Sequence, residues 1–342
     1  MTCLTCFVLG CLLTWRLIAP DASIFADGTP GRWAESPRDF QAFATASAIG
    51  LANRSEGPPR IVIAGTSLIL AAFGSPERTQ EVLQRDTGHP VEVAVLAAGA
   101  NTLLHSFALL DMSFKTSGGI AILGINELTL GVSPHDQDVM IERSPLGFSS
   151  MPARALARTA LGSRQRIEAF GPFDALRFYA ARLRSYARNV RSGRQFEAQT
   201  KFPFEREPEG PLPDLSAKAW STRTIEDDAD FMATTETALA ELDAIITHFE
   251  SRSDVALVLM LDPLNLATLK DRRTLEALQQ ARERLEQLAR RRGIRLSDAL
   301  RNAPIKPAQF IDYGHIASET ARNQLRHALS AEIAPLLGDQ PE

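Results

Sequence analysis

The chain has 342 residues, of which 44% are hydrophobic and 23% are charged, and its formal net charge at pH 7 is −4. These values are typical of an ordinary soluble globular protein with a large core, so no disulfide or metal is needed to hold the fold together. Because the net charge is negative, the protein as a whole lacks the basic character of a nucleic-acid-binding protein.

Residues 1–20 are strongly apolar and have the character of a targeting segment. A membrane-spanning helix needs about 20 apolar residues, and this run is slightly short and carries Arg16 near its end. We expect an uncleaved membrane anchor that tethers the protein on the extracytoplasmic, periplasmic side, although the flanking charges do not fix the orientation. The alternatives are a cleaved signal sequence of a secreted protein, a lipoprotein signal that ends at Cys11, and a buried N-terminal helix.

All three cysteines, Cys3, Cys6 and Cys11, lie in this stretch, so the folded body contains no disulfide, which suits either redox compartment. Cys3 and Cys6 form a CxxC motif. A redox or metal site would need a second pair or a fold around the motif, and we therefore interpret the cysteines as apolar residues of the membrane segment.

Residues 21–58 contain several glycines and prolines, and we interpret them as a linker or stalk with one short helix over residues 40–51. The main domain is predicted over residues 59–342. Short apolar runs predict its buried strands at 60–64, 91–96, 119–123, 255–261 and 294–296. Capping residues and apolar spacing predict its helices at 75–88, 101–114, 270–292 and 318–337.

Strands that alternate with helices predict a parallel sheet with helices on both faces. The apolar residues of each strand are continuous rather than alternating, which fits a sheet that is covered on both sides. We therefore predict a three-layer α/β/α, flavodoxin-like fold around a parallel sheet of about five strands.

Residues 128–235 interrupt the alternation, and we interpret them as a long helical insertion that starts in the loop after Asn126. The segment holds ten arginines between Arg154 and Arg194 and almost no acids in that range. A solvated helical surface explains these arginines, and contact with anionic lipid or anionic polysaccharide is the alternative. The acidic residues at 226–230 are predicted to form the first turn of the next helix.

Ligands of parallel α/β sheets bind at the carboxyl ends of the strands, so the residues that directly follow each strand are the candidates for a site. Four blocks stand at such places: Gly-Thr-Ser at 65–67, Ala-Gly-Ala-Asn at 98–101, Gly-Ile-Asn-Glu at 124–127 and, before the last helix, Asp-Tyr-Gly-His at 312–315. Each block alone has a structural explanation, such as a helix cap for Ser67, a turn for Gly99 and Asn126, and a surface position for His315. Together, and in this order, they indicate a catalytic site.

The chemistry of these residue types is that of a serine nucleophile. Ser67 needs a base before it can attack, and His315 can supply that base. Asp312 can hold the imidazole in the required tautomer and stabilise its charged form. A spacing of three residues lets the Asp312 and His315 side chains project from one short turn toward the same serine.

With these blocks the sequence resembles the SGNH (GDSL-like) hydrolase family, over about residues 60–126 and 254–337. The family's four named residues and its aspartate fall on Ser67, Gly99, Asn126, His315 and Asp312. The resemblance implies acyl transfer through an acyl-enzyme on Ser67 and no metal or organic cofactor. It also implies an oxyanion hole made of the Ser67 and Gly99 backbone N–H groups and the Asn126 side chain.

Two positions depart from the family pattern, because the family often has aspartate where this chain has Thr66 and Glu127. Neither change removes a catalytic atom, but both argue against the simple secreted-lipase branch. The N-terminal anchor, divergent blocks and long insertion are similar to membrane-anchored relatives that modify envelope polysaccharides. We therefore expect a small acyl ester such as acetate as donor, water or the hydroxyl of a glycan as acceptor, and a membrane-bound partner that supplies acyl groups.

Two rival functions remain at this point. One is a non-catalytic scaffold or binding subunit of an envelope polysaccharide complex, against which the intact Ser67, Asn126, Asp312 and His315 argue. The other is a soluble cytoplasmic esterase, which an N-terminus packed into the core would favour.

Other site types do not match the motifs of the chain. No Gly-x-Gly-x-x-Gly follows the first strand, and no Gly-Lys-Ser/Thr phosphate loop occurs. Ile69 stands where the nucleophile elbow of α/β-hydrolases has glycine. His-Asp-Gln-Asp at 135–138 lacks a second cluster of metal ligands, so we interpret it as a solvated loop.

Overall fold

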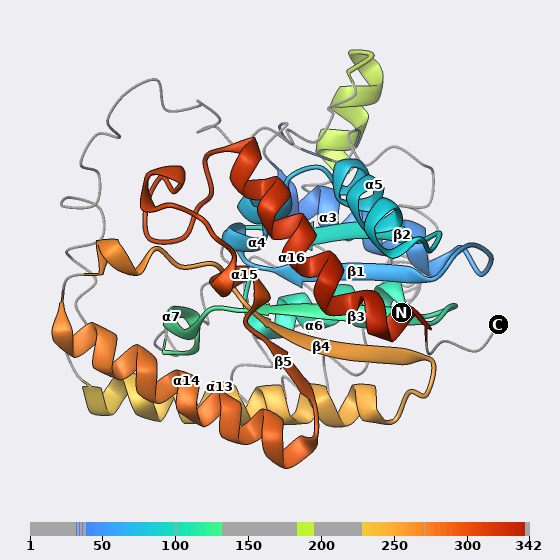
Figure 1. Ribbon diagram of the computed structural model, residues 1–342. Coiled ribbons are helices and arrows are strands. Elements are labelled where there is room, and N and C mark those ends of the chain that lie inside the picture. Colours follow the sequence, from blue (N-terminus) through green and yellow to red (C-terminus); the bar gives the residue numbers. More distant parts are fainter. Residues whose placement is uncertain are drawn as a thin grey trace, which may run out of the picture.

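The computed structural model describes residues 32, 34, 36, 39–99, 101–131, 183–194, 228–269 and 271–338. Within them, five parallel strands form one sheet in the order β2-β1-β3-β4-β5 (Figure 1). The strands are β1 (Arg60–Gly65), β2 (Glu92–Ala97), β3 (Gly119–Ile125), β4 (Val255–Leu261) and β5 (Arg295–Ser297). This order is that of flavodoxin-like sheets, and the predicted three-layer α/β fold is confirmed.

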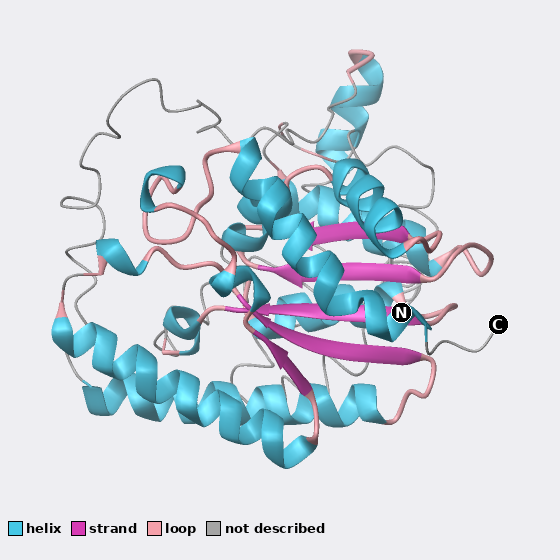
Figure 2. Ribbon diagram, viewed as in Figure 1, coloured by secondary structure: helices cyan, strands magenta, loops and turns pink. Residues whose placement is uncertain are grey.

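The named helices lie between and around these strands. In chain order they are α3 (Phe40–Ala52), α4 (Ser67–Phe73), α5 (Pro76–Thr87), α6 (Leu103–Ser113), α7 (Glu127–Leu130), α13 (Asp228–Glu250), η3 (Leu266–Thr268), α14 (Arg272–Arg292), α15 (Ala299–Asn302), η4 (Pro307–Gln309) and α16 (Glu319–Gly338). Figure 2 shows the helices on both sides of the sheet.

Alternate residues of each strand point to opposite faces of the sheet, and both faces are buried. Ile63, Ile122 and Met260 belong to a core that includes residues of α4, α5 and α16. On the other face, their neighbours Ala64 and Leu123 pack in a core with α3, α6, α13 and α14. Burial of both faces explains why the central strands β1, β3 and β4 are apolar at nearly every position rather than at every second one.

Helix α3 corrects the predicted linker over residues 21–58. Ala44, Ala48, Ile49 and Leu51 are buried in the core that also contains α6 and α13. The α/β domain therefore begins before residue 59, at or before the start of α3. The short helix itself was predicted, but its nearly continuous apolar sequence marks a core helix rather than part of a solvated stalk.

The start and stop signals of two helices work as predicted. Ser75 caps α5, its side chain accepts a hydrogen bond from the Arg78 N–H at 3.3 Å, and Gly88 ends the helix in the left-handed region at φ 73°. Gly293 ends α14 in the same way, with φ 62°. Helix α13 begins at Asp228, within the acidic segment predicted to open it.

Several predictions lie outside the described residues. These are the membrane anchor at 1–20, most of the insertion at 128–235 and the His-Asp-Gln-Asp segment at 135–138. Within the described part of the insertion, residues 183–191 are helical. No helix of the described residues is long and apolar enough to span a membrane.

The strand order places a topological switch at β1. Strand β1 pairs with β2 on one side and β3 on the other. The chain leaves β1 through α4 and α5 on one face of the sheet and returns from β2 to β3 through α6 on the opposite face. In sheets of this order, ligands bind at the carboxyl ends of the strands beside such a switch.

Candidate active site

Ser67 lies at this switch point, as the first residue of α4 directly after β1. Thr66 caps the helix, and its hydroxyl accepts a hydrogen bond from the Leu68 N–H at 3.2 Å. The interpretation of Ser67 as a helix cap is therefore wrong. Because Thr66 does the capping, the Ser67 hydroxyl is left for other contacts.

Two glycines let α4 approach the strand ends closely. A Cβ added to Gly65 would stand 2.6 Å from Cγ1 of Ile69, and one added to Gly124 would also collide with that side chain. Ile69 thus occupies the space that any larger residue at position 65 or 124 would take. Because neither glycine has a Cβ, α4 packs closely against β1 and β3, and its first turn places Ser67 at the carboxyl ends of these strands.

His315 reaches Ser67 and Asp312 at the same time. Its Nε2 lies 2.9 Å from the Ser67 Oγ, and its Nδ1 lies 2.8 Å from Oδ2 and 3.0 Å from Oδ1 of Asp312. When the ring proton is on Nδ1 and is donated to Asp312, Nε2 can accept the proton of the serine hydroxyl. The three residues that the sequence predicted as catalytic therefore form a continuous hydrogen-bonded relay.

Asp312 is held as a carboxylate. Burial alone would raise its pKa, but the hydrogen bond and charge of His315 and the backbone N–H groups of Gly314 and His315 outweigh it, so the pKa is lowered from 3.8. Those two N–H groups donate to Oδ1 at 3.0 and 2.9 Å. Oδ2 is consequently the oxygen that the imidazole contacts most closely.

The segment that follows β4 holds the loop that carries Asp312 and His315. The Asn265 N–H donates to the Tyr313 carbonyl at 2.6 Å. Tyr313 packs with Leu68 of α4 and with Leu264 in a small buried cluster. The acid and base therefore sit on a loop that contacts the residue next to the nucleophile.

Asn126 presents an unpaired donor at the end of β3. Its Oδ1 caps α7 by accepting from the Leu128 N–H at 3.0 Å, while its Nδ2 is buried and has no hydrogen-bond partner among the described residues. An unmade hydrogen bond of a buried amide is costly. The Asn126 side chain thus leaves one N–H donor at the carboxyl end of β3. An oxyanion bound there would accept from this donor, whereas a purely structural role in a turn would not explain it.

Gly99 lies at the same edge, but the protein itself does not require glycine there. Ala97, the last residue of β2, pairs with Gly65, the last residue of β1, so Gly99 lies just beyond the carboxyl ends of these two strands. It is exposed, and a Cβ added to it would meet no atom of the described residues within 4 Å. Its role as an oxyanion donor remains a prediction.

Asp262 is a candidate residue that the sequence analysis missed. It directly follows β4, is fully buried, and its Oδ2 accepts from the Thr66 hydroxyl at 3.1 Å, while Oδ1 has no partner among the described residues. Burial raises the pKa of Asp262 to about 7, with the hydrogen bond from Thr66 opposing and the charge of Glu127 adding to the rise. The rule that strand ends carry sites would have found it.

Glu127, the residue after the oxyanion candidate Asn126, is locked by a buried ion pair. Both its oxygens accept from Arg301 of α15, the Oε2–Nη2 contact being 2.7 Å. Arg301 Nη2 also donates to the Asp262 carbonyl at 3.1 Å. A bidentate pair of this kind fixes geometry as well as charge, so it ties α7 to the end of β4.

The raised pKa of Asp262 predicts a stability change with pH that Asp262→Asn removes. The folded protein binds this proton more tightly than the unfolded chain does, so the stabilisation is complete below pH 3.8 and is lost as the pH rises through about 7. The free energy of unfolding of the wild type should therefore fall relative to that of Asp262→Asn across this window. Urea unfolding in small pH steps measures the difference.

Asp254→Asn is the control for this measurement. The hydrogen bond from Arg252 lowers the pKa of Asp254 despite some burial. The stability that Asp254 contributes is therefore lost as the pH falls, not as it rises. Parallel curves for wild type and Asp262→Asn would mean that Asp262 takes up no proton on folding.

Comparison with models of known protein families gave no match, and comparison with curated proteins gave none. The geometry of the site therefore carries the functional argument. Among the described residues, no group of three or more His, Cys, Asp or Glu side chains is arranged to hold a metal ion.

Proposed function

We propose that this protein is a serine-dependent acyl-ester hydrolase or O-acyltransferase of the SGNH (GDSL-like) type. The relay from Asp312 through His315 to Ser67 carries the proposal, above all the 2.9 Å between His315 Nε2 and Ser67 Oγ. A scaffold that had lost its chemistry would have no need to keep an acid, a base and a nucleophile in hydrogen-bonding order.

The first half-reaction forms an acyl-enzyme. Ser67 Oγ attacks the ester carbonyl carbon while His315 Nε2 takes the hydroxyl proton, and the Asp312 carboxylate stabilises the imidazolium. The negative charge on the carbonyl oxygen is met by Asn126 Nδ2 and by the backbone N–H groups of Ser67 and Gly99. The tetrahedral intermediate collapses when His315 returns its proton to the leaving alcohol.

The second half-reaction repeats these steps with a new nucleophile. Water gives a free acid, and a sugar hydroxyl gives a transferred acyl group; His315 deprotonates either one. We propose a small acyl group such as acetyl, carried by or passed to a carbohydrate or cell-envelope glycan. The membrane-anchored, extracytoplasmic location and the acyl-donor partner in the membrane rest on the sequence of residues 1–20 and on the resemblance described above.

A fluorophosphonate probe tests the proposal, because it phosphonylates only an activated serine. The full chain is used, since α3 is part of the core. Mass spectrometry should find the label on Ser67 in the wild type and in Ser75→Ala, a change at a solvent-exposed helix cap. Ser67→Ala should remain unlabelled and His315→Ala should label far more slowly. A wild type without label on Ser67 would favour the scaffold.

A further inference from the structure

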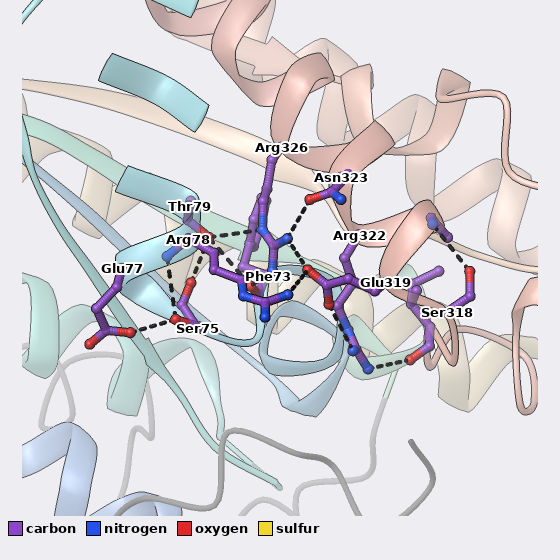
Figure 3. Close-up of polar contacts among 12 residues, drawn as sticks. Phe73, Ser75, Glu77, Arg78, Thr79, Ser318, Glu319, Arg322, Asn323 and Arg326 are labelled. Carbon is purple, nitrogen blue, oxygen red and sulfur yellow. Dashed lines mark hydrogen bonds and ion pairs between the residues drawn. The ribbon is translucent and has the colours of Figure 1, made fainter. Parts of the chain in front are cut away.

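The nucleophile helix α4 is held at its far end by two buried arginines of α16, which Figure 3 shows side by side. Arg322 Nε donates to the Ala71 carbonyl at 2.9 Å, and Arg326 Nη2 donates to the Phe73 carbonyl at 2.7 Å. Their side chains are only 3% and 1% exposed. Cationic donors at the C-terminal carbonyls of a helix satisfy its last acceptors, so the two arginines act as the cap of α4.

Glu319, at the start of α16, contacts both guanidinium groups. Its Oε2 lies 3.3 Å from Arg322 Nη1 and its Oε1 lies 2.5 Å from Arg326 Nη1. Burial alone would raise the pKa of Glu319, but its arginine contacts outweigh it and lower the pKa, so the carboxylate stays charged. Arg322 and Arg326 are thus alike in three ways: both contact Glu319, both lie on α16, and both are almost fully buried.

Arg322 has one contact of a different kind. Its Nη2 donates to the Ile316 carbonyl at 3.2 Å. Ile316 is buried, follows His315 directly and forms an antiparallel bridge with Phe310 across the base of the loop. One planar guanidinium therefore contacts both the helix that begins with Ser67 and the loop that ends with His315.

Among the described residues, the hydrogen bonds of Arg326 go to helices α4, α5 and α16. Its Nε lies 3.3 Å from the Thr79 hydroxyl of α5, and its other nitrogens bind α4 and α16. In the described contacts it reaches no residue of the loop at 310–316. The two arginines therefore form a matched pair for mutagenesis. They are alike in burial and both contact α4 and Glu319, but only Arg322 contacts the loop at 310–316, which we call the histidine loop.

We infer that Arg322 is a positioning residue, which sets the separation of Ser67 Oγ and His315 Nε2 by fixing α4 relative to the histidine loop. The inference rests on the proposed function, because that separation matters only if Ser67 is activated by His315. A misplacement of about 1 Å can cost about 10²-fold in rate. Lysine cannot replace Arg322, because an ammonium group lacks the planar fork that reaches two carbonyls at once.

Matched substitutions test the inference. Arg322→Met and Arg326→Met remove the guanidinium and keep an apolar stem, and the corresponding lysine variants keep the charge if the methionine variants do not fold. With p-nitrophenyl acetate, kcat of the Arg322 variant should fall by about 10²-fold with KM within about twofold of wild type. The Arg326 variant should lose comparable stability in urea unfolding but keep kcat within about threefold.

Crystal structures of the same variants give a readout that does not depend on activity. We expect the Ser67 Oγ to His315 Nε2 distance to exceed about 3.5 Å in the Arg322 variant and to stay near its wild-type value in the Arg326 variant. Equal distances and equal kcat losses in the two variants would overturn the inference. If the wild type itself shows no Ser67-dependent turnover, the proposed function fails, and the distances still decide whether Arg322 positions the pair.

Discussion

Ser67→Ala and His315→Ala should each lower kcat for p-nitrophenyl acetate by about 10⁶-fold, and the double variant should lose no more than either single variant. Ser67 Oγ and His315 Nε2 are 2.9 Å apart and act as one unit, since the serine is a weak nucleophile without the base and the base has nothing to deprotonate without the serine. Residual rate in all three variants would come from the oxyanion donors, which the substitutions leave in place.

The control for this pair is His327→Ala. His327 is a half-exposed histidine that contacts Asp86 on the surface, so its loss changes the number of histidines without touching the relay. It should keep wild-type kcat. Losses that multiply in the Ser67→Ala, His315→Ala double variant would show two independent effects and would refute a shared relay. Wild-type turnover by Ser67→Ala would place the nucleophile elsewhere.

The strands and most helix ends could be predicted because their signals are local. A buried strand of a parallel sheet is apolar along its whole length, as β4 shows, and glycine at a helix end, as at Gly88 and Gly293, adopts a left-handed conformation that other residues avoid. Helix α4 was missed because Ser67–Phe73 is apolar all around and gives no helical period. It is buried between the sheet and α16, so tertiary packing rather than amphipathicity forms it.

The site was predictable where it depends on short spacing. Asp312 and His315 are three residues apart, Asn126 directly follows β3, and one residue separates Ser67 from β1, so each could be proposed from the chain alone. Asp262 meets Thr66 across 196 residues, and Arg322 meets Ala71 across 251. An arginine on a helix is usually solvated, so only the folded structure shows that Arg322 caps a buried helix.

Asp312→Asn should lower kcat by about 10⁴-fold without unfolding the protein. In the wild type, Oδ1 of Asp312 accepts from the backbone N–H groups of Gly314 and His315 and lies 3.0 Å from His315 Nδ1, while Oδ2 is the nearer oxygen to Nδ1, at 2.8 Å. The amide oxygen of asparagine can replace Oδ1 only, because an NH2 group cannot accept from those N–H donors. Its NH2 group then faces Nδ1 and donates to it, which puts the ring proton on Nε2.

That tautomer points a proton at Ser67 Oγ and cannot take one from it, so the serine stays unactivated although every side chain remains in place. Nitrogen chemical shifts of His315 in ¹⁵N-histidine-labelled protein should show the proton on Nδ1 in the wild type and on Nε2 in Asp312→Asn. Asp86→Asn is the matched control, since Asp86 also contacts a histidine Nδ1, that of His327, but away from Ser67. If Asp312→Asn stays within tenfold of wild-type kcat, or keeps the Nδ1 proton, the aspartate does not set the tautomer. The activation of Ser67 would then have to come from His315 alone.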